Sequence, residues 1–310
     1  MMDSKVKKTF SHARGRMVRG RELAVAAAIV GLFSATCAAH AQEAAKSDAA
    51  TLDRVVSVGG DATEILYALG LEQKIVAVDS TSMYPKAALE TKSNVGYLRQ
   101  LTTEGVLSTG ATILVASAQA GPPDVVRALK ASNIRYETLP GNEAPDKIAD
   151  KVRFVGKLFH VTDKAEVLAS DITKRFAALE EKRKSITHKV KAIFILGVNN
   201  GRAMVGGTGS TADIVLGLAG AENAAASLHG YKPLTDEALI SLAPDVIVTM
   251  TREGGGKASE YIAALPGFKD SPAGKAGRII EMDGNYLLGF GPRTPEAAEE
   301  LMADFYPDKK

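Results

Sequence analysis

The sequence contains a single cysteine, Cys37, which lies within the first forty residues. The rest of the chain therefore forms no disulfide bond of its own, and its stability must come from a buried core. A Gly-x-Ser-x-Gly motif and a His-Glu-x-x-His motif are also missing, which argues against the hydrolases built on them. After the first forty residues there is no apolar run long enough to cross a membrane.

The first 41 residues have the pattern of a cleaved export signal. Seven Lys and Arg side chains accompany the apolar run LAVAAAIVGLFSATCAA (23–39). This run is shorter than the roughly 20 residues of a membrane-spanning helix, and the small-residue sequence AHA (39–41) is typical of a cleavage site. We therefore expect export to the periplasm, with Gln42 as the first mature residue. A retained membrane anchor is the alternative interpretation.

Charge is nearly balanced once this signal is set aside. The chain carries 38 basic and 36 acidic side chains, of which residues 1–41 hold 7 and 2, so the remainder has 31 and 34. The net charge of the mature chain is then about −3, because the basic excess belongs to the export signal. This balance gives no indication of a nucleic-acid-binding surface.

Short β-branched runs alternate with helical patterns from Arg54 onward. RVVSV (54–58) predicts a strand, and DATEILYALG (61–70) predicts a helix with Asp61 or Thr63 as its cap. This alternation is typical of a parallel, doubly wound α/β sheet. We expect the following organisation: export signal 1–41, flexible mature N-terminus 42–52, N-terminal α/β lobe 53–160, linking long helix 161–188 and C-terminal α/β lobe 189–310.

Residues 146–186 have apolar side chains at helical spacing and contain no proline. They predict a short helix followed by a long one over about 163–186, with Thr162 or Asp163 as its cap. Two α/β lobes joined by one rigid helix would hold a ligand cleft between them at the strand ends. Such a linker has few hinge positions, so we expect only a small closing motion.

The two halves of the chain resemble each other. Without a gap, LTTEGVLSTGATILVAS (101–117) aligns with LTDEALISLAPDVIVTM (234–250), with five of 17 positions identical. The alignment covers a predicted helix and the strand after it. We infer that the two lobes arose by duplication.

Tyr97 and Arg99 lie two positions apart just before this repeat, in NVGYLRQL (94–101). In an extended segment both side chains would share one face, and Gly96 would leave room at the backbone. A guanidinium close to a phenol favours the phenolate, which is a suitable ligand for ferric iron. Tyr97 is therefore either an iron ligand or a half-buried packing residue.

VGYLRQLTTEGVLS (95–108) resembles the haem-binding segment of periplasmic haem-binding proteins, which supply bacterial haem ABC importers. These proteins belong to the helix-linked class of solute binders, which also carries cobalamin and ferric siderophores. The resemblance covers nearly all of the mature chain. It implies that Tyr97 is the axial ligand of the haem iron and that Arg99 supports its phenolate.

The same resemblance implies further haem contacts. Arg252 matches a basic position that pairs with a haem propionate, and an arginine fork suits such a carboxylate. Tyr231 and Tyr286 are cleft residues by position, although simple packing would explain them equally well. Some relatives resemble this chain but carry a histidine in the second lobe where GVNNG (197–201) stands here. A second axial ligand is therefore in doubt, and His229 is the nearest substitute.

Glu104 and Glu237 occupy equivalent positions of the internal repeat. In the family that the chain resembles, one surface glutamate on each lobe docks onto arginines of a two-fold symmetric permease. Two such carboxylates on a rigid body could bind two cations at once. Alternatively, each acid only complements the dipole of the helix that it begins.

The resulting prediction is a monomeric, non-enzymatic periplasmic carrier of ferric haem. It would receive haem b released by an outer-membrane receptor and deliver it to an inner-membrane ABC permease. A cobalamin or ferric-siderophore binder of the same class is the first alternative. The second is an exported α/β hydrolytic enzyme that uses the loop VGGTGSTAD (205–213), in which Ser210 or Thr211 would otherwise cap a helix.

Overall fold

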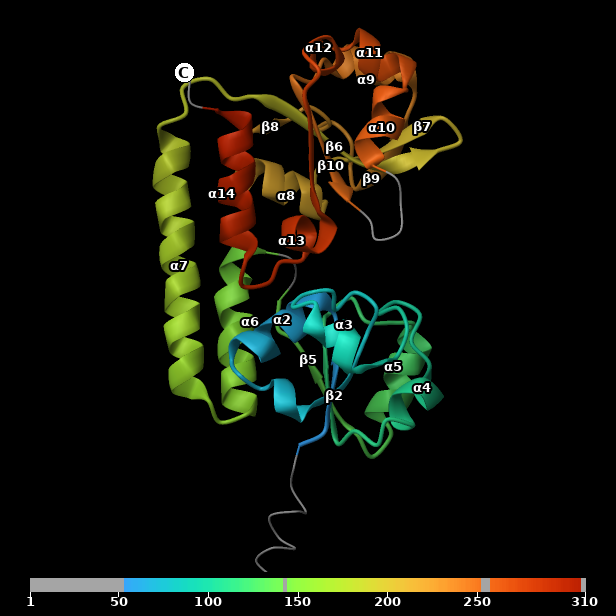
Figure 1. The fold of residues 1–310 in the computed structure, drawn as a ribbon, viewed down its shortest axis with the longest axis vertical. Coiled ribbons are helices and arrows are strands. Elements are labelled where there is room, and N and C mark those ends of the chain that lie inside the picture. The colour runs from blue at the N-terminus through green and yellow to red at the C-terminus, as the bar shows by residue number, and fades with distance from the viewer. Residues whose placement is uncertain (1–52, 142–143, 252–256, 308–310) are drawn as a thin grey trace, which may run out of the picture. The chain divides into compact units, whose positions relative to one another are not determined.

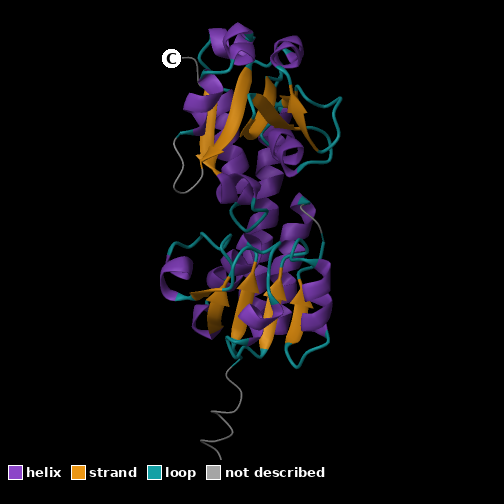
Figure 2. Cartoon of the chain, turned by 90° about the vertical axis from the view of Figure 1, so that its right-hand side faces the viewer, coloured by secondary structure: helices purple, strands orange, loops and turns teal. Residues whose placement is uncertain are grey.

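The computed structural model describes residues 53–141, 144–251 and 257–307, so the predicted export signal and Arg252 lie outside the described residues. Two sheets organise this part of the chain (Figures 1 and 2). We call the part built on β1–β5 the N-terminal lobe and the part built on β6–β11 the C-terminal lobe. The elements up to the second lobe are β1 (Val55–Val58), α2 (Gly60–Ala68), η1 (Glu72–Lys74), β2 (Ile75–Val78), α3 (Ala87–Thr91), β3 (Ser93–Asn94), α4 (Thr103–Leu107), β4 (Ile113–Ala116), α5 (Pro123–Lys130), β5 (Arg135–Thr138), α6 (Pro145–Leu158) and α7 (Thr162–Lys184).

The sheet of the N-terminal lobe is parallel throughout, with the strand order β3-β2-β1-β4-β5. Its three central strands, β1, β2 and β4, are mainly apolar and buried on both faces because helices cover both sides, whereas the outer strands β3 and β5 are polar and partly exposed. In β4, Ile113 and Val115 pack with α2 and α6, whereas Leu114 and Ala116 pack in a second cluster with Val106 of α4. The strand order reverses between β1 and β4, and this reversal is where open α/β sheets bind ligands.

The sheet of the C-terminal lobe is mixed, with the order β11-β10-β6-β7-β9. β6, β10 and β11 are parallel, whereas β7 runs antiparallel to both β6 and β9. The short β8 adds a parallel pairing to β6. The elements of this lobe are β6 (Lys191–Asn199), β7 (Arg202–Gly206), α8 (Thr211–Leu218), β8 (Glu222–Asn223), β9 (Tyr231–Leu234), α9 (Asp236–Leu242), β10 (Val246–Thr251), α10 (Ala258–Ala263), α11 (Pro266–Asp270), α12 (Pro272–Lys275), β11 (Ile279–Asp283), α13 (Gly284–Leu288) and α14 (Thr294–Phe305).

One cluster of buried apolar side chains runs without a break through both lobes. It includes Val55 of β1, Ile172 of α7 and Phe194 of β6, together with Phe305 of α14. The long helix α7 packs against α6, α8 and α14 and so belongs to this shared core (Figure 1). A continuous close-packed core resists relative motion of its parts, and the small closing motion expected from the sequence stays a prediction.

Two helix starts differ from the prediction. Helix α2 begins at Gly60 after Gly59, without a side-chain cap, because the carboxylate of Asp61 binds Lys151 instead. Helix α7 likewise has no side-chain cap and starts at Thr162. The prediction that Asp61 or Thr63 caps the first helix, and that Thr162 or Asp163 caps the long one, is therefore wrong. The end of α2 is as predicted, since Gly70 follows it with φ of 74°.

The two repeat segments fold alike. Leu101–Ser117 and Leu234–Met250 each form a short helix and then a strand, α4 with β4 and α9 with β10. Thr102 and Thr235 cap the two helices in the same way, accepting hydrogen bonds from Gly105 N and Ala238 N. From 101–109 and from 234–242 the order of buried, half-buried and exposed positions is identical.

The predicted fold class is thus confirmed: two similar α/β lobes with mainly parallel sheets and a single long connecting helix. Within residues 53–307, leaving aside the gaps noted above, every helix is too short or too polar to traverse a bilayer.

Candidate functional site

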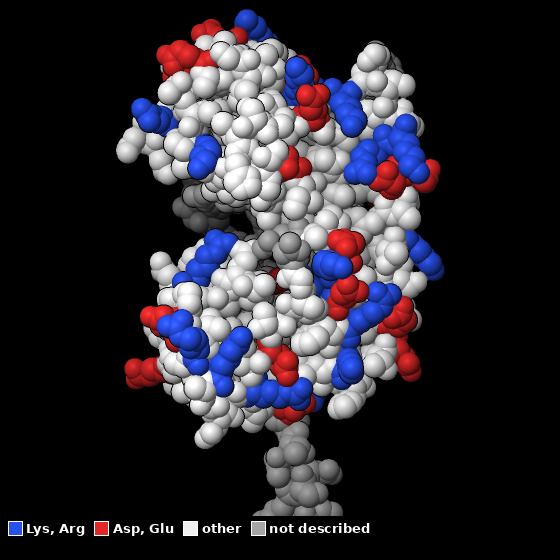
Figure 3. All heavy atoms as spheres, turned by 180° about the vertical axis from the view of Figure 1, so that it is seen from behind, with Lys and Arg blue, Asp and Glu red and all other residues white. Residues whose placement is uncertain are grey.

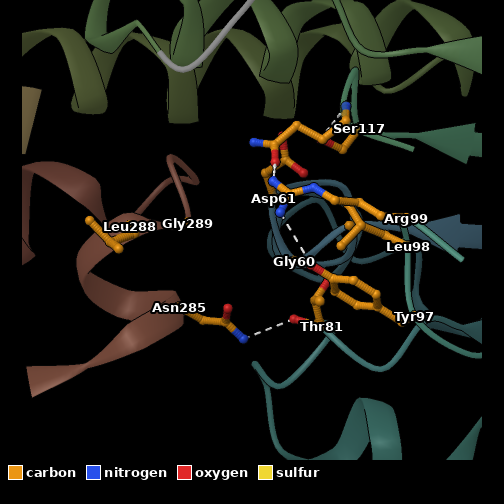
Figure 4. A pocket seen from close by; sticks show the side chains of 12 residues that line it. Gly60, Asp61, Thr81, Tyr97, Leu98, Arg99, Ser117, Asn285, Leu288 and Gly289 are labelled. Carbon is orange, nitrogen blue, oxygen red and sulfur yellow. Dashed lines mark hydrogen bonds between the residues drawn. The ribbon is translucent and has the colours of Figure 1, made fainter. Parts of the chain in front are cut away.

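A pocket of about 180 Å³ lies where the two lobes meet. Its N-terminal side follows the carboxyl ends of β1, β2 and β4, and its C-terminal side is formed by α13 and the residue after it. The pocket therefore occupies the point where the strand order reverses, the expected ligand position in an open α/β sheet. Figure 4 shows the facing side chains of the lining, which consists of Gly59, Gly60, Asp61, Thr81, Tyr97, Leu98, Arg99, Ser117, Gln119, Asn285, Leu288 and Gly289.

Tyr97 and Arg99 both line this pocket and contact each other. The guanidinium nitrogen Nη1 of Arg99 donates a hydrogen bond to the phenol oxygen of Tyr97 at 3.2 Å (Figure 4). Nη2 of the same guanidinium donates to Oε1 of Gln119. Tyr97 is 38% exposed, so the residue is accessible from the solvent side of the pocket. A phenol held beside a fixed positive charge is suited to ligating a metal ion.

The backbone around Tyr97 turns, whereas the sequence predicted an extended segment. The amide of Gln100 donates to the carbonyl of Tyr97 at 2.7 Å. Leu98 and Leu101 are buried in the second apolar cluster of the lobe, the one that contains Leu114 and Val106. The carbonyl of Leu98 accepts a hydrogen bond from the N–H of Gly121, and the N–H of Leu101 donates one to the carbonyl of Gly121. Burial of Leu98 leaves its two neighbours, Tyr97 and Arg99, to face the pocket.

Two adjacent glycines form the pocket floor. Gly59 has φ of 110°, and a Cβ there would lie 2.6 Å from Cβ of Ser117. A Cβ at Gly60 would lie 2.9 Å from the carbonyl oxygen of Thr81. The buried carboxylate of Asp79 joins these parts, because it accepts hydrogen bonds from Gly59 N at 2.8 Å and from Thr81 N at 2.9 Å. The floor is consequently close-packed and fixed.

A buried ion pair adjoins this floor, and its carboxylate residue, Asp61, itself lines the pocket. Nζ of Lys151 on α6 lies 2.8 Å from Oδ2 of Asp61 on α2, and the two side chains are only 5% and 7% exposed. The ammonium also donates to the carbonyl oxygen of Phe290 at 3.5 Å. The pair therefore connects the pocket floor with both α6 and the second lobe.

Further contacts cross between the lobes beside the pocket. Nδ2 of Asn285 donates to the carbonyl oxygen of Thr81 at 2.9 Å (Figure 4). The backbone N–H of Arg293 donates to Glu64 at 2.9 Å, and its guanidinium lies 3.3 Å from the ring centroid of Tyr84. These polar contacts bridge the two lobes beside the pocket, in addition to the apolar core that the lobes share.

A second hollow of about 390 Å³ adjoins the pocket. Asn285 and Leu288 line both cavities and separate them. Met83 from the N-terminal lobe and Met250 from the C-terminal lobe contribute flexible apolar walls. The surface is visibly hollowed between the lobes, and basic and acidic side chains are interspersed on the face drawn in Figure 3.

The structure does not bring every predicted site residue to the Tyr97 pocket. Gly96, the residue before Tyr97, is not in the pocket lining. It has φ of 92°, and its N–H donates a hydrogen bond to Oδ1 of Asn94. Tyr231 is hydrogen-bonded to Thr211 within its own lobe at 3.0 Å. Tyr286 lies next to the pocket residue Asn285 but not in the lining. Burial, together with the acidic residues of α14, raises its pKa, so this phenol stays neutral.

The remaining predicted polar residues lie elsewhere. His229 is exposed beside Gly209. Ser210 caps α8, accepting a hydrogen bond from Asp213 N at 3.2 Å, as the sequence suggested for this loop. Glu104 and Glu237 are exposed on α4 and α9. Among the residues that the structure describes, no three His, Cys, Asp or Glu side chains gather to hold a metal ion.

Gln119 and Asn285 are pocket residues that the sequence did not indicate. Gln119 follows the carboxyl end of β4, a position where α/β proteins place ligand-binding residues, so a positional signal existed. Asn285 reaches Thr81 across 204 positions of the chain. Only the assembled lobes bring that pair together.

Two doubly wound lobes, a rigid connecting helix and a pocket between them define a solute-binding protein of the helix-linked class. The chain belongs to the periplasmic binding protein family, whose model matches residues 55–286. It is accordingly a substrate-binding protein and not an enzyme.

Relatives and solved structures agree with this assignment. The chain is 28% identical to the ABC transporter substrate-binding lipoprotein YvrC of Bacillus subtilis, covering 82% of this chain and 80% of that one. It is 24% identical to the vitamin B12-binding protein of Vibrio parahaemolyticus, covering 82% and 90%. The structure is similar to the apo periplasmic haem-binding protein RhuT of Roseiflexus, with a TM-score of 0.77, 33% identity and coverage of 82% and 98%. It is also similar to a periplasmic haem-binding protein of Pseudomonas aeruginosa, with a TM-score of 0.75 and 34% sequence identity. This match covers 83% of this chain and 94% of that one.

Proposed function

We propose that this protein captures ferric haem between its lobes in the periplasm and delivers it to an ABC permease in the inner membrane. Haem is the transported ligand, and Tyr97 is the axial ligand of its iron. The observation that carries the proposal is the Arg99–Tyr97 contact, because it holds an exposed phenol oxygen beside a fixed positive charge at the ligand position of the fold. The haem-binding proteins among the similar structures support the same assignment.

The residues present fit this ligand. Ferric iron prefers hard oxygen donors, and tyrosine is among the known axial ligands of haem. A porphyrin brings its own four nitrogen ligands, so a single protein oxygen is sufficient and no cluster of metal-binding side chains is needed. Met83, Met250 and Leu288 provide apolar contact for the ring next to the Tyr97 pocket. The predicted pairing of Arg252 with a haem propionate stays a prediction, because Arg252 lies outside the described residues.

Loading is expected to part the contacts across the pocket. The 180 Å³ pocket is smaller than ordinary ligand sites, which occupy roughly 300–1,000 Å³. Parting Asn285 from Thr81 would join it to the hollow lined by Met83 and Met250. Because only Asn285 and Leu288 of α13 line both cavities, we expect a small movement of α13 to be sufficient.

Titration of the purified protein with hemin tests the proposal. We expect a stoichiometric complex with the high-spin ferric absorption spectrum of a tyrosinate-ligated haem, and loss of this spectrum in Tyr97→Phe. Tyr261→Phe is the matched control, because Tyr261 is an exposed tyrosine on α10, outside the pocket. An identical spectrum in wild type and Tyr97→Phe would reject Tyr97 as the ligand.

Cobalamin is the second candidate ligand, because vitamin B12-binding proteins are among the relatives. A corrin would bring its own lower ligand and would not need a phenolate. In that case isothermal titration would show tight binding of cyanocobalamin, no Soret band would form with hemin, and Tyr97→Phe would bind as wild type does.

A further inference from the structure

Gln119 reaches the site residues Tyr97 and Arg99 from a second loop. Its Oε1 accepts a hydrogen bond from Nη2 of Arg99, and Nη1 of the same guanidinium donates to the phenol oxygen of Tyr97 at 3.2 Å. All three residues line the pocket between the lobes. Gln119 therefore stands one contact behind Tyr97 and can act on it through Arg99.

The contact with Gln119 fixes the direction of the Arg99 side chain. A guanidinium is a planar fork, so anchoring one of its terminal nitrogens sets the position of the other. Arg99 is exposed, and a long exposed side chain samples many rotamers unless a partner holds it. Gln119 is half-buried and follows the end of β4. It thus selects the rotamer of Arg99 in which Nη1 meets Tyr97.

The backbones of the two loops are tied together on both sides of Arg99. The N–H of Gly121 donates to the carbonyl of Leu98 at 2.8 Å, and the N–H of Leu101 donates to the carbonyl of Gly121 at 3.0 Å. A Cβ added at Gly121 would lie 3.7 Å from the carbonyl oxygen of Arg99, so the two loops are in van der Waals contact. Because Gln119 shortly precedes Gly121, its side chain extends toward Arg99 from a fixed backbone.

Both groups that hold the Arg99 guanidinium are neutral, since one is an amide oxygen and the other a phenol oxygen. The carboxylate of Asp61, which also lines the pocket, is paired with Lys151. A carboxylate in the place of the Gln119 amide would form an ion pair with the guanidinium and reduce the positive field at the phenol oxygen. The amide positions the cation and leaves its charge to act on Tyr97.

We infer that Gln119 is a positioning residue of the haem site, whose amide holds the Arg99 guanidinium against the oxygen of Tyr97 without compensating its positive charge. This inference rests on the proposed function, in which that oxygen is the ligand of ferric iron. A hydrogen bond from the guanidinium withdraws electron density from the phenolate, which moves its charge-transfer band with the iron to higher energy. The position of this band therefore reports whether Arg99 is in place.

Hemin titration of Gln119→Leu tests the inference. Leucine offers no acceptor, so we expect the charge-transfer band to move to longer wavelength and hemin affinity to fall by about tenfold, as for loss of an outer-shell partner. Gln100→Leu is the matched control, because Gln100 is the exposed glutamine next to Arg99 and lies outside the pocket lining. It should give the wild-type band and affinity, and melting curves verify that both variants are folded. A wild-type band in Gln119→Leu would overturn the inference.

Two further variants separate positioning from a merely structural role. In an Arg99→Leu background, Gln119→Leu should change neither the band nor the affinity further, because Gln119 acts through Arg99. Additive effects of the two substitutions would overturn this path. In Gln119→Glu the guanidinium stays anchored but is neutralised, so we expect a band between those of wild type and Gln119→Leu. A wild-type band in Gln119→Glu would overturn the role of the neutral amide.

The proposed function and this inference fail in different ways. If wild type forms no tyrosinate charge-transfer band with hemin, the haem proposal fails, and the positioning of Arg99 is measured in the unliganded protein. Nitrogen relaxation of the Arg99 Nε–H by NMR should then show an ordered side chain in wild type and in Gln100→Leu, and faster, wider motion in Gln119→Leu. Equal order in wild type and Gln119→Leu would overturn the inference whatever the cargo is.

Discussion

Leu101–Ser117 of the N-terminal lobe and Leu234–Met250 of the C-terminal lobe fold as the same helix and strand, yet the residues just before them differ. Continuing the alignment places Gly230 opposite Tyr97 and Lys232 opposite Arg99. The first lobe therefore holds the phenol and its guanidinium, and the second lobe holds neither. If the cargo is haem and the permease is two-fold symmetric, as proposed, equivalent helices would suit the permease, and asymmetric ligand-facing segments would suit a cargo with one iron.

The sheets of the two lobes also differ, because the first is entirely parallel and the second is mixed. The first sheet is entirely parallel, so the pocket can form where its strand order reverses. In the second sheet the antiparallel strand β7 lies beside β6. The second lobe instead closes the pocket through α13, whose Asn285 contacts Thr81. Under the proposed function, the first lobe would supply the ligand to the iron, and the second lobe would cover the pocket.

The largest effect is expected at the buried ion pair between Lys151 and Asp61, which lies next to the pocket in the first lobe. In Lys151→Met the carboxylate of Asp61 loses its partner while remaining buried, so we expect a loss of about 3–5 kcal/mol in the free energy of unfolding, measured by urea denaturation. Arg153→Met is the control, because it removes only an exposed pair with Glu166, which solvent screens, and should cost far less. Lys151→Met combined with Asp61→Asn should recover part of the loss. Equal losses for the two single variants would contradict this account.

The comparison of the two lobes is tested next by a pair of tyrosine substitutions. We expect Tyr97→Phe to weaken hemin binding by about 100-fold or more, since even outer-shell changes at metal sites cost 10–100-fold. Tyr231→Phe in the second lobe removes only a hydrogen bond to Thr211 and should change affinity a few-fold at most. Fluorescence quenching by hemin measures both constants. A larger loss for Tyr231→Phe would reverse the assignment of ligand chemistry to the first lobe.

A smaller effect is expected at the cover. Asn285→Ala removes the hydrogen bond to Thr81, so opening costs less and hemin should associate and dissociate several-fold faster, with little change in affinity. A net hydrogen bond contributes about 1 kcal/mol, which corresponds to roughly fivefold in rate. Stopped-flow absorbance measures both rates. Asn199→Ala, on the exposed end of β6, is the control. Unchanged rates in Asn285→Ala would show that this bond does not limit opening.

The smallest effect concerns the protonation of Glu237. The backbone N–H of Glu237 itself and the hydroxyl of Thr235 hold the pKa of this exposed carboxyl below its usual range. Its stabilising contribution is therefore present above the unfolded-state pKa and is lost as the pH falls through the lowered folded-state pKa. We expect Thr235→Val to raise this pKa, and Thr102→Val in the first lobe to leave it unchanged, as measured by NMR titration. A pKa that does not move in Thr235→Val would exclude the hydroxyl as the cause.

The sequence predicted the lobes, the long helix and the Tyr97–Arg99 pair because each depends on local patterns. Hydrophobic spacing marks buried strands and helices, and two residues near each other in the chain stay near each other in space. Strands β7 and β9 were not predicted, although Asn200-Gly201 is a dipeptide that favours a tight hairpin turn, and both residues have positive φ.

Other features depend on contacts that the sequence pattern does not contain. Asp61 was expected to cap α2, but its carboxylate binds Lys151, which is 90 positions away. Gln119 orients Arg99 from a different loop, 20 positions further along. Long-range polar contacts of this kind are fixed only when the lobes assemble, so a linear pattern cannot reveal them.

Resonance Raman spectroscopy of the ferric haem complex tests the central claim most directly. With excitation into the phenolate-to-iron charge-transfer band, we predict tyrosinate ring modes in the wild-type complex that shift when the protein is grown with ring-deuterated tyrosine and that disappear in Tyr97→Phe. A wild-type complex without these modes, or modes that persist in Tyr97→Phe, would contradict the assignment of Tyr97 as the ligand of the haem iron.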